Sequence, residues 1–134
     1  MHVRLRVGAE AYALAVENVL EVAQLGQIAP VPGSGPYVLG VYNLRGEVLP
    51  VFDLAKLFGI EREVEPDRLL VTEHAGRKAG FAVSDVSDVG ALPDAVQEAE
   101  SDFLSGASLF EGELIGIIDV PRVFDALERG GAAG

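Results

Sequence analysis

Apolar and polar residues alternate along much of this chain, in short runs that end at glycine-containing turns. The first run, HVRLRV, places valine or leucine at every second position, between charged or polar residues. A period of two is typical of a β-strand with one buried face. Similar runs, rich in β-branched residues, predict strands over residues 2–7, 12–16, 37–44, 47–53, 68–74, 79–83, 103–110 and 113–118. The chain is therefore predicted to be all-β.

Short tips between these runs predict hairpins. They are Gly8-Ala9-Glu10, Arg45-Gly46, Ala75-Gly76-Arg77 and Glu111-Gly112, and each contains a glycine that tolerates the positive φ of a tight turn. The segment IAPVPGSGPY (28–37) holds three prolines and two glycines. Such a composition predicts an extended connection and no helix.

Short helices are predicted after two of the strands. Asp53 and Asp119 each follow a strand and precede an apolar run, which is the position of an N-cap carboxylate. Pro121 suits the first turn of the second helix, and Gly130-Gly131 is expected to end it.

Two further segments carry valine at every third position. The valines are at 16, 19 and 22, and again at 83, 86 and 89. This spacing fits one face of a helical turn, and it also fits a strand that bends. The sequence leaves both alternatives open.

The chain contains an internal repeat. Residues 37–58, YVLGVYNLRGEVLPVFDLAKLF, align without gaps on residues 103–124, FLSGASLFEGELIGIIDVPRVF. Upstream, AVENVLEV (15–22) matches AVSDVSDV (82–89), with one residue of slippage between the blocks. Two matches in the same order favour duplication over chance.

The repeat divides the chain into pseudo-repeat halves of about 1–60 and 68–127, with the seam at 61–67. A unit of roughly 60 residues is only marginally stable alone. We therefore expect one domain of two similar small barrels that share a continuous apolar core.

The composition limits the classes of function. At 134 residues, with 49 % hydrophobic residues and a net charge of −11, the chain is globular and acidic. This charge opposes binding to nucleic acid, which small barrels achieve with basic grooves and exposed aromatic residues. The chain has no cysteine and no apolar run near the roughly 18 residues of a membrane span. A cytoplasmic protein without disulfides is expected.

No constellation of residues predicts a cofactor, metal or nucleophile site. The only histidines, His2 and His74, have no partner at metal-ligand spacing, and both are predicted to be surface residues. The GxSxG motif of a nucleophile elbow is absent.

Paired carboxylates are the one feature that suits an enzyme. The repeat places Glu47 opposite Glu113 and Asp53 opposite Asp119, and symmetric acids can share a proton. That chemistry needs a tight Asp-Thr/Ser-Gly loop, whereas Asp-Leu-Ala and Asp-Val-Pro stand here. Helix capping accounts for the aspartates and strand edges for the glutamates. We expect no enzymatic activity.

Protein recognition remains, and the repeated hairpin turn favours it. Asn43-Leu44-Arg45-Gly46 in the first half matches Leu109-Phe110-Glu111-Gly112 in the second, so the tip reverses its charge while the glycine persists. The turn itself does not require Arg45. This arginine is either a solvated turn residue or a contact to a partner.

Several segments together resemble the CheW family of chemotaxis coupling proteins. They are GAEAYALAVENVLEV, IAPVPGSGPYVLGVYNLRGEVLPVFDL, VSDVSDV and FLSGASLFEGELIGIIDV, within a resemblance from about residue 3 to 127. The resemblance implies two five-stranded SH3-like barrels around a common core, with short helices that include one at the C-terminus. It also implies an adaptor without catalysis or cofactor.

The family's partners are implied in the same way. They are the cytoplasmic tip of methyl-accepting chemoreceptors, the regulatory domain of the histidine kinase CheA, and other CheW-like modules in rings. Recruitment to receptor arrays at the inner face of the membrane would follow, without membrane insertion. A CheW-like regulatory domain or an adaptor of a non-flagellar pathway, such as pilus motility, fits the same residues, as a stand-alone module or as part of a larger protein.

Carried over by motif, the receptor-binding residues are Arg45, Glu21, Val19, Gly40, Val86 and Val89. The valines of both halves are expected either to line an apolar groove for a receptor helix or to lie in the core. For Val16 and Val83 we expect the core. Many relatives have arginine after the strand-end Asp-Leu, where Ala55 and Lys56 stand here, so a partner contact at that position is not carried over.

Overall fold

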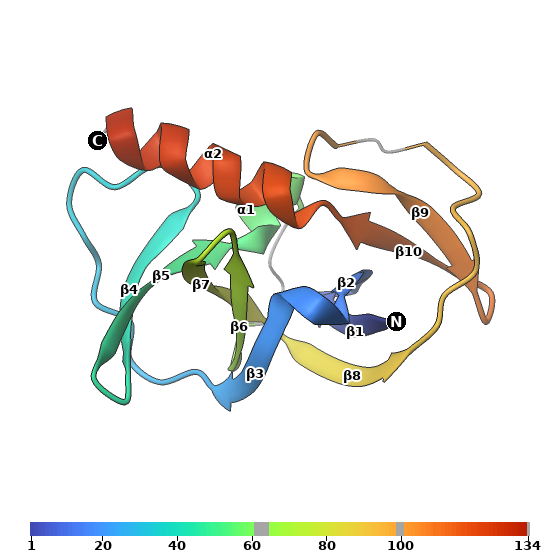
Figure 1. Ribbon diagram of the computed structural model, residues 1–134, viewed down its shortest axis with the longest axis horizontal. Helices are drawn as coiled ribbons and strands as arrows, with labels where there is room; N and C mark the ends of the chain where they lie inside the picture. The colour runs from blue at the N-terminus through green and yellow to red at the C-terminus, as the bar shows by residue number, and fades with distance from the viewer. Residues whose placement is uncertain (61–64, 99–100, 134) are drawn as a thin grey trace.

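The computed structural model describes residues 1–60, 65–98 and 101–133 (Figure 1). The strands are β1 (His2–Val7), β2 (Glu10–Ala15), β3 (Val19–Gln24), β4 (Val38–Leu44), β5 (Glu47–Asp53), β6 (Arg68–His74), β7 (Arg77–Val83), β8 (Asp85–Gly90), β9 (Leu104–Phe110) and β10 (Glu113–Ile118). The helices are α1 (Leu54–Phe58), α2 (Val120–Ala133) and a 3-10 turn, Val16–Asn18. The all-β prediction is confirmed. Most of the predicted seam, residues 61–64, lies outside the described residues.

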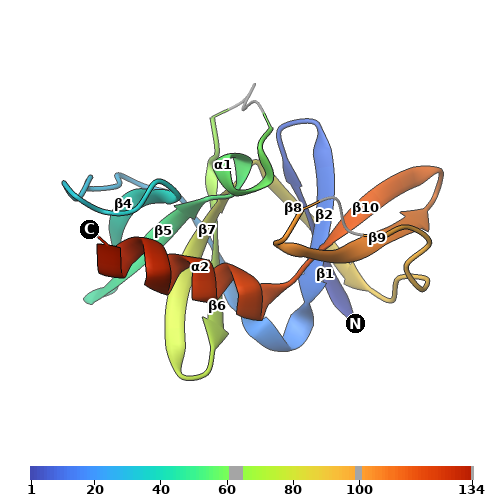
Figure 2. The same cartoon turned by 90° about the horizontal axis from the view of Figure 1, so that it is seen from above.

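The strands form two five-stranded sheets, which we name barrel 1 (order β8-β1-β2-β10-β9) and barrel 2 (order β3-β6-β7-β5-β4). Figure 2 shows them on either side of the molecule, with α2 reaching from barrel 1 across barrel 2. Each barrel takes a hairpin from one half of the chain and three strands from the other. The strands of the two halves therefore interleave.

Tight turns join the hairpins where the sequence predicts them. Arg45 and Gly46 have φ values of 50° and 89°, and φ is likewise positive at both residues of Ala75-Gly76 and of Glu111-Gly112. Positive φ at both central residues defines the type I′ turn, whose twist matches that of the flanking strands. The Oδ1 atom of Asn43 accepts a hydrogen bond from the amide of Gly46 at 2.8 Å.

One apolar core joins the two barrels, as predicted. Leu5 and Leu14 of barrel 1 belong to the same buried cluster as Phe52 and Phe81 of barrel 2. The first turns of α2 add Phe124, whose ring lies 6.4 Å from the ring of Phe52. We name this cluster the shared core. A second, smaller cluster fills the interior of barrel 2.

Both predicted helix caps are confirmed. The Oδ1 atom of Asp53 accepts a hydrogen bond from the amide of Lys56 at 3.3 Å, and Oδ1 of Asp119 accepts one from the amide of Arg122 at 3.2 Å. The prediction that Gly130-Gly131 ends the second helix is wrong, because α2 continues to Ala133. Glycine in a helix costs about 1 kcal/mol per residue, which lowers stability without forbidding the helix.

Candidate protein-docking surface

Strands β3 and β8 begin where the chain crosses from one barrel to the other. The crossing from β2 to β3 uses the 3-10 turn, and the crossing from β7 to β8 uses Ser84 alone. Backbone bonds fix both crossings, from the amide of Val16 to the carbonyl of Met1 at 3.1 Å and from Ser84 to Arg6 at 2.9 Å. Each strand is an edge of its sheet, and Figure 1 shows both along the lower side of the molecule.

A β-bulge in β8 explains the three-residue spacing of its valines. Val86 pairs with Leu5 and Val89 pairs with Val3, so two residues of β8 oppose one residue of β1. Because Val3 and Leu5 both face the shared core, the bulge keeps both valines of β8 on that face. Val86 packs against the core, whereas 51 % of Val89 is exposed.

A matching bulge shapes β3. Val19 pairs with Thr72 and Val22 pairs with Leu70, again with one extra residue between them. Val19 packs against the shared core, and Val22 is 45 % exposed. Of the two alternatives for these segments, the bent strand is correct.

The two valines expected in the core differ in burial. Val83 is fully buried, as predicted. The prediction for Val16 is wrong, because this residue is 38 % exposed in the 3-10 turn. The turn carries the backbone between the barrels and leaves the side chain of Val16 partly in solvent.

Arg45 and Glu21 form an ion pair across the opening of barrel 2. Glu21 lies in β3 and Arg45 in the β4–β5 turn, so the pair links the two edges of this sheet. The hydrogen bond to Glu21 raises the pKa of Arg45 above its usual value. The side chain of Arg45 remains 68 % exposed, so its guanidinium retains donors for a partner's carboxylate.

Gly40 lies in β4, the edge strand of barrel 2 opposite β3. It is buried, and an added Cβ would be 2.3 Å from the carbonyl oxygen of Ala29. Ala29 forms an isolated bridge with Val41 and so covers the free edge of β4. Gly40 presents no side chain to a partner, and the absence of its Cβ permits this close approach of Ala29.

The structure thus brings Arg45 into contact with Glu21 and places both valine pairs on the side that faces the shared core. The sequence did not predict one ion pair at the bulge of β8. Asp88 aligns with Glu21 in the repeat and pairs with Arg4 at 2.6 Å. The alternation in HVRLRV places Arg4 on the face of β1 that points away from the shared core, and the repeat aligns Asp88 with Glu21. Neither pattern predicts that Arg4 and Asp88 form an ion pair.

The two aspartates on which the enzyme alternative rested have structural positions. Asp53 and Asp119 cap helices, and neither lines the hollow that Tyr12 and Phe58 border. The part of the chain that the structure describes contains no group of three potential metal ligands. Within that part, no helix is long and apolar enough to cross a membrane.

The histidines are less exposed than predicted. His74 is half-buried, with its ring 5.8 Å from that of Phe124. His2 is also half-buried, and burial lowers its pKa. Neither histidine is the simple surface residue expected from the sequence, because both belong to strands that border the shared core.

Residues 2–128 match the family model of the CheW-like domain. The chain belongs to the CheW-like family. This CheW-like chain is 30 % identical to the chemotaxis protein CheW of Rhizobium meliloti (strain 1021), over 95 % of this chain and 88 % of the relative. It is also 30 % identical to the chemotaxis protein CheW of Bacillus subtilis (strain 168), over 89 % and 83 % of the two chains.

A solved structure confirms the CheW-like fold. The scaffolding protein TtCheW from Thermoanaerobacter tengcongensis superposes with a TM-score of 0.80 and 29 % identity, over 89 % of this chain and 83 % of that protein. The fold is thus two five-stranded SH3-like barrels with a shared core. Another relative is the protein FrzA of Myxococcus xanthus, 36 % identical over 66 % of this chain and 56 % of FrzA. The CheW-like family is one of scaffolding proteins in chemotaxis.

Proposed function

We propose that this chain is a non-enzymatic adaptor that couples chemoreceptors to the histidine kinase CheA. Its proposed partners are the cytoplasmic tip of a methyl-accepting chemoreceptor, the regulatory domain of CheA and, in rings, other CheW-like modules. In this proposal the protein acts in the cytoplasm and is recruited to receptor arrays at the inner face of the membrane. It neither inserts into the membrane nor binds nucleic acid.

The observation that carries the proposal is the common face of the two bulged strands. Val19 and Val22 of β3 and Val86 and Val89 of β8 lie on the side of their sheets that faces the shared core. The exposed side chains of Val22 and Val89 offer apolar contacts of the kind that an amphipathic helix fills. The ion pair of Arg45 with Glu21 lies beside β3 and supplies an exposed, orienting charge.

Binding of the full chain to each proposed partner tests the function. Isothermal titration with a receptor's cytoplasmic tip, and separately with the CheA regulatory domain, should give dissociation constants of about tens of micromolar, as for weak transient complexes. Val89→Asp should weaken binding to the receptor tip and leave binding to the CheA domain unchanged. Leu114→Asp is a matched control, because Leu114 is exposed to a similar extent, 48 %, on β10.

The outcomes separate the parts of the proposal. If neither partner binds the unmodified chain at about 100 μM, the adaptor function is wrong. If both partners bind and Leu114→Asp affects the receptor tip as much as Val89→Asp does, the face of β3 and β8 is not the docking surface.

A second candidate is an adaptor or regulatory domain of a non-flagellar chemosensory pathway. The match to FrzA favours it, because that relative does not carry the CheW name. Deletion of the gene in its own organism distinguishes the two. Loss of swimming chemotaxis supports the first function, and loss of surface motility with intact swimming chemotaxis supports the second.

A further inference from the structure

The bulges of β3 and β8 occupy matching positions, and each contains a carboxylate. Asp88 lies in the bulge of β8 opposite Arg4, and Glu21 lies in the bulge of β3 opposite Val71. Both carboxylates bind an arginine. The arginines, however, come from different elements of the two barrels.

Glu21 pairs with Arg45 at the β4–β5 turn of barrel 2. The matching turn of barrel 1 carries Glu111, which cannot neutralise a carboxylate. Asp88 pairs instead with Arg4 of β1, with 2.6 Å between Nη2 and Oδ1. Arg4 therefore supplies in barrel 1 the charge that Arg45 supplies in barrel 2.

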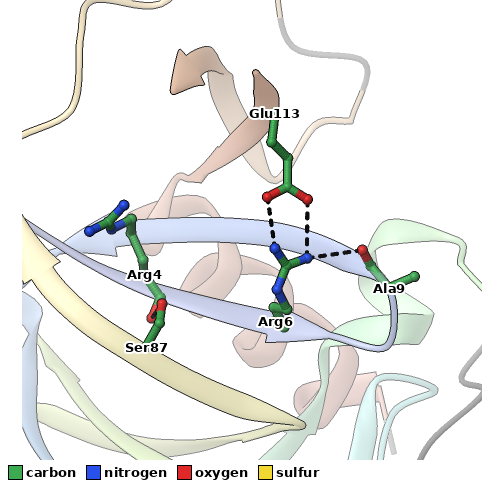
Figure 3. A network of polar contacts seen from close by, with 5 residues as sticks. All are labelled: Arg4, Arg6, Ala9, Ser87 and Glu113. Atoms are coloured by element: carbon green, nitrogen blue, oxygen red, sulfur yellow. Dashed lines mark hydrogen bonds and ion pairs between the residues drawn. The ribbon is translucent and has the colours of Figure 1, made fainter. Parts of the chain in front are cut away.

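Arg4 contacts both residues of the bulge and is itself held in place. Its carbonyl oxygen accepts a hydrogen bond from the hydroxyl of Ser87 at 3.2 Å, while its guanidinium binds Asp88. The guanidinium carbon lies 4.4 Å from the ring centroid of Phe110 in β9. The side chain is 21 % exposed, and Figure 3 shows it beside Ser87, on the same side of β1 as Arg6. One residue thus ties the bulge of β8 to the opposite edge of barrel 1.

The bulge decides which side chain β8 presents. In the observed register Val89 lies opposite Val3, on the face of the shared core. If β8 continued from Val86 without a bulge, Asp88 would lie opposite Val3 and Val89 would turn to the other face. A slip of one residue exchanges the faces of a strand, so an apolar contact would be replaced by a negative charge.

We propose that Arg4 is a positioning residue that selects the bulged register of β8. It thereby presents Val89, and not Asp88, beside Val86 to the partner bound on this face. In barrel 2 the matching position is Val71, which is buried in the barrel interior. Packing of Val71 thus fixes the bulge of β3, as the Arg4 ion pair fixes the bulge of β8 in barrel 1. The identity of the partner as a receptor helix rests on the proposed function, whereas the register does not.

Nuclear magnetic resonance of the full chain tests the register without any partner. Arg4→Met keeps a side chain over Phe110 and removes the contact with Asp88. Cross-strand contacts between backbone protons of Val3 and Val89 should weaken, and contacts between Val3 and Asp88 should appear in a second set of signals. Arg6→Met is the matched control, because Arg6 lies on the same strand and side but pairs with Glu113.

Binding to the receptor tip is the second readout. We expect about three- to tenfold weaker binding for Arg4→Met, a loss consistent with one partly exposed ion pair, and recovery to within about twofold for Arg4→Lys.

A single, native register of β8 in Arg4→Met would overturn the proposal. If Arg4→Met does not fold, Asp88→Ala removes the same ion pair from the exposed side and should give the same second register; a native register there overturns the proposal too. Failure of the unmodified chain to bind would overturn the proposed function and leave the register result standing.

Discussion

Arg6 of β1 and Glu113 of β10 form a bidentate ion pair across barrel 1, over the strand β2 that separates them (Figure 3). The Nη1–Oε2 and Nη2–Oε1 distances are 3.1 and 2.7 Å. The hydrogen bonds from Arg6 lower the pKa of Glu113, and the same bonds raise the pKa of Arg6. The pair joins the first strand of the chain to the last.

This ion pair predicts a pH-dependent part of the stability. Because the pKa of Glu113 is lowered in the folded protein, the stabilisation is present above the unfolded pKa and is lost as the pH falls through the folded pKa. We expect Glu113→Gln to lower the free energy of unfolding by about 0.5 kcal/mol at neutral pH, since both side chains are partly exposed. In urea unfolding, the difference from the unmodified chain should shrink as the pH is lowered and the Glu113 carboxylate becomes protonated.

Glu111→Gln, on the same hairpin, is the control for this measurement. It should leave the free energy of unfolding nearly unchanged at every pH of the series. A difference for Glu113→Gln that does not shrink as the pH is lowered would assign the effect to packing and not to the charge.

Arg45→Glu is predicted to weaken binding to a receptor tip by about tenfold or more, because it reverses an exposed charge and repels Glu21. Since Arg45 is exposed at a turn, the melting temperature should fall by no more than about 3 °C. The charge reversal Glu111→Arg at the matching turn is the control and should leave receptor binding intact. A large fall in melting temperature would make Arg45 a structural residue.

Gly40→Ala is predicted to lower the free energy of unfolding by about 2–3 kcal/mol. The new Cβ would collide with the carbonyl oxygen of Ala29, a backbone atom that the bridge to Val41 holds in place. Gly46→Ala provides the comparison, because its φ is 89° but no atom lies within 4 Å of an added Cβ. It should cost about 1 kcal/mol, from backbone strain alone. Equal losses in urea unfolding would contradict the role assigned to Gly40.

The two caps predict a graded response to substitution. Asp53→Ala and Asp119→Ala should each lower the free energy of unfolding by about 1 kcal/mol, because each leaves a helix amide without its acceptor. Asp53→Asn and Asp119→Asn should retain most of the stability, since asparagine caps as well as aspartate. If asparagine lowers the free energy of unfolding as much as alanine does, the stabilisation comes from the carboxylate charge and not from the capping hydrogen bond.

The sequence predicted the regular strands and the turns because both are local. Alternation identified β4 and β5, and the dipeptide Arg45-Gly46 marked the turn between them. The same alternation did not identify β3 and β8 as strands. Their bulges insert one residue, which changes the spacing of the inward valines from two to three. A pattern of three does not distinguish a bulged strand from a helical turn.

The contacts between distant residues were beyond local patterns. Arg45 and Glu21 are 24 residues apart and meet only because barrel 2 brings its edge strands together. The burial of Gly40 likewise follows from the bridge between Ala29 and β4. The family resemblance named these residues, and the structure adds what each of them touches.

The interleaving of the two halves has a consequence for the origin of the molecule. Barrel 1 takes β1 and β2 from the first half, and barrel 2 takes β6 and β7 from the second. A polypeptide of one half would therefore close a barrel only by accepting a hairpin from a second copy, as in a strand-exchanged homodimer. Fusion of two such copies into one gene turns a symmetric dimer into a single chain. Each barrel could then evolve separately, in line with the arginine at one tip and the glutamate at the other.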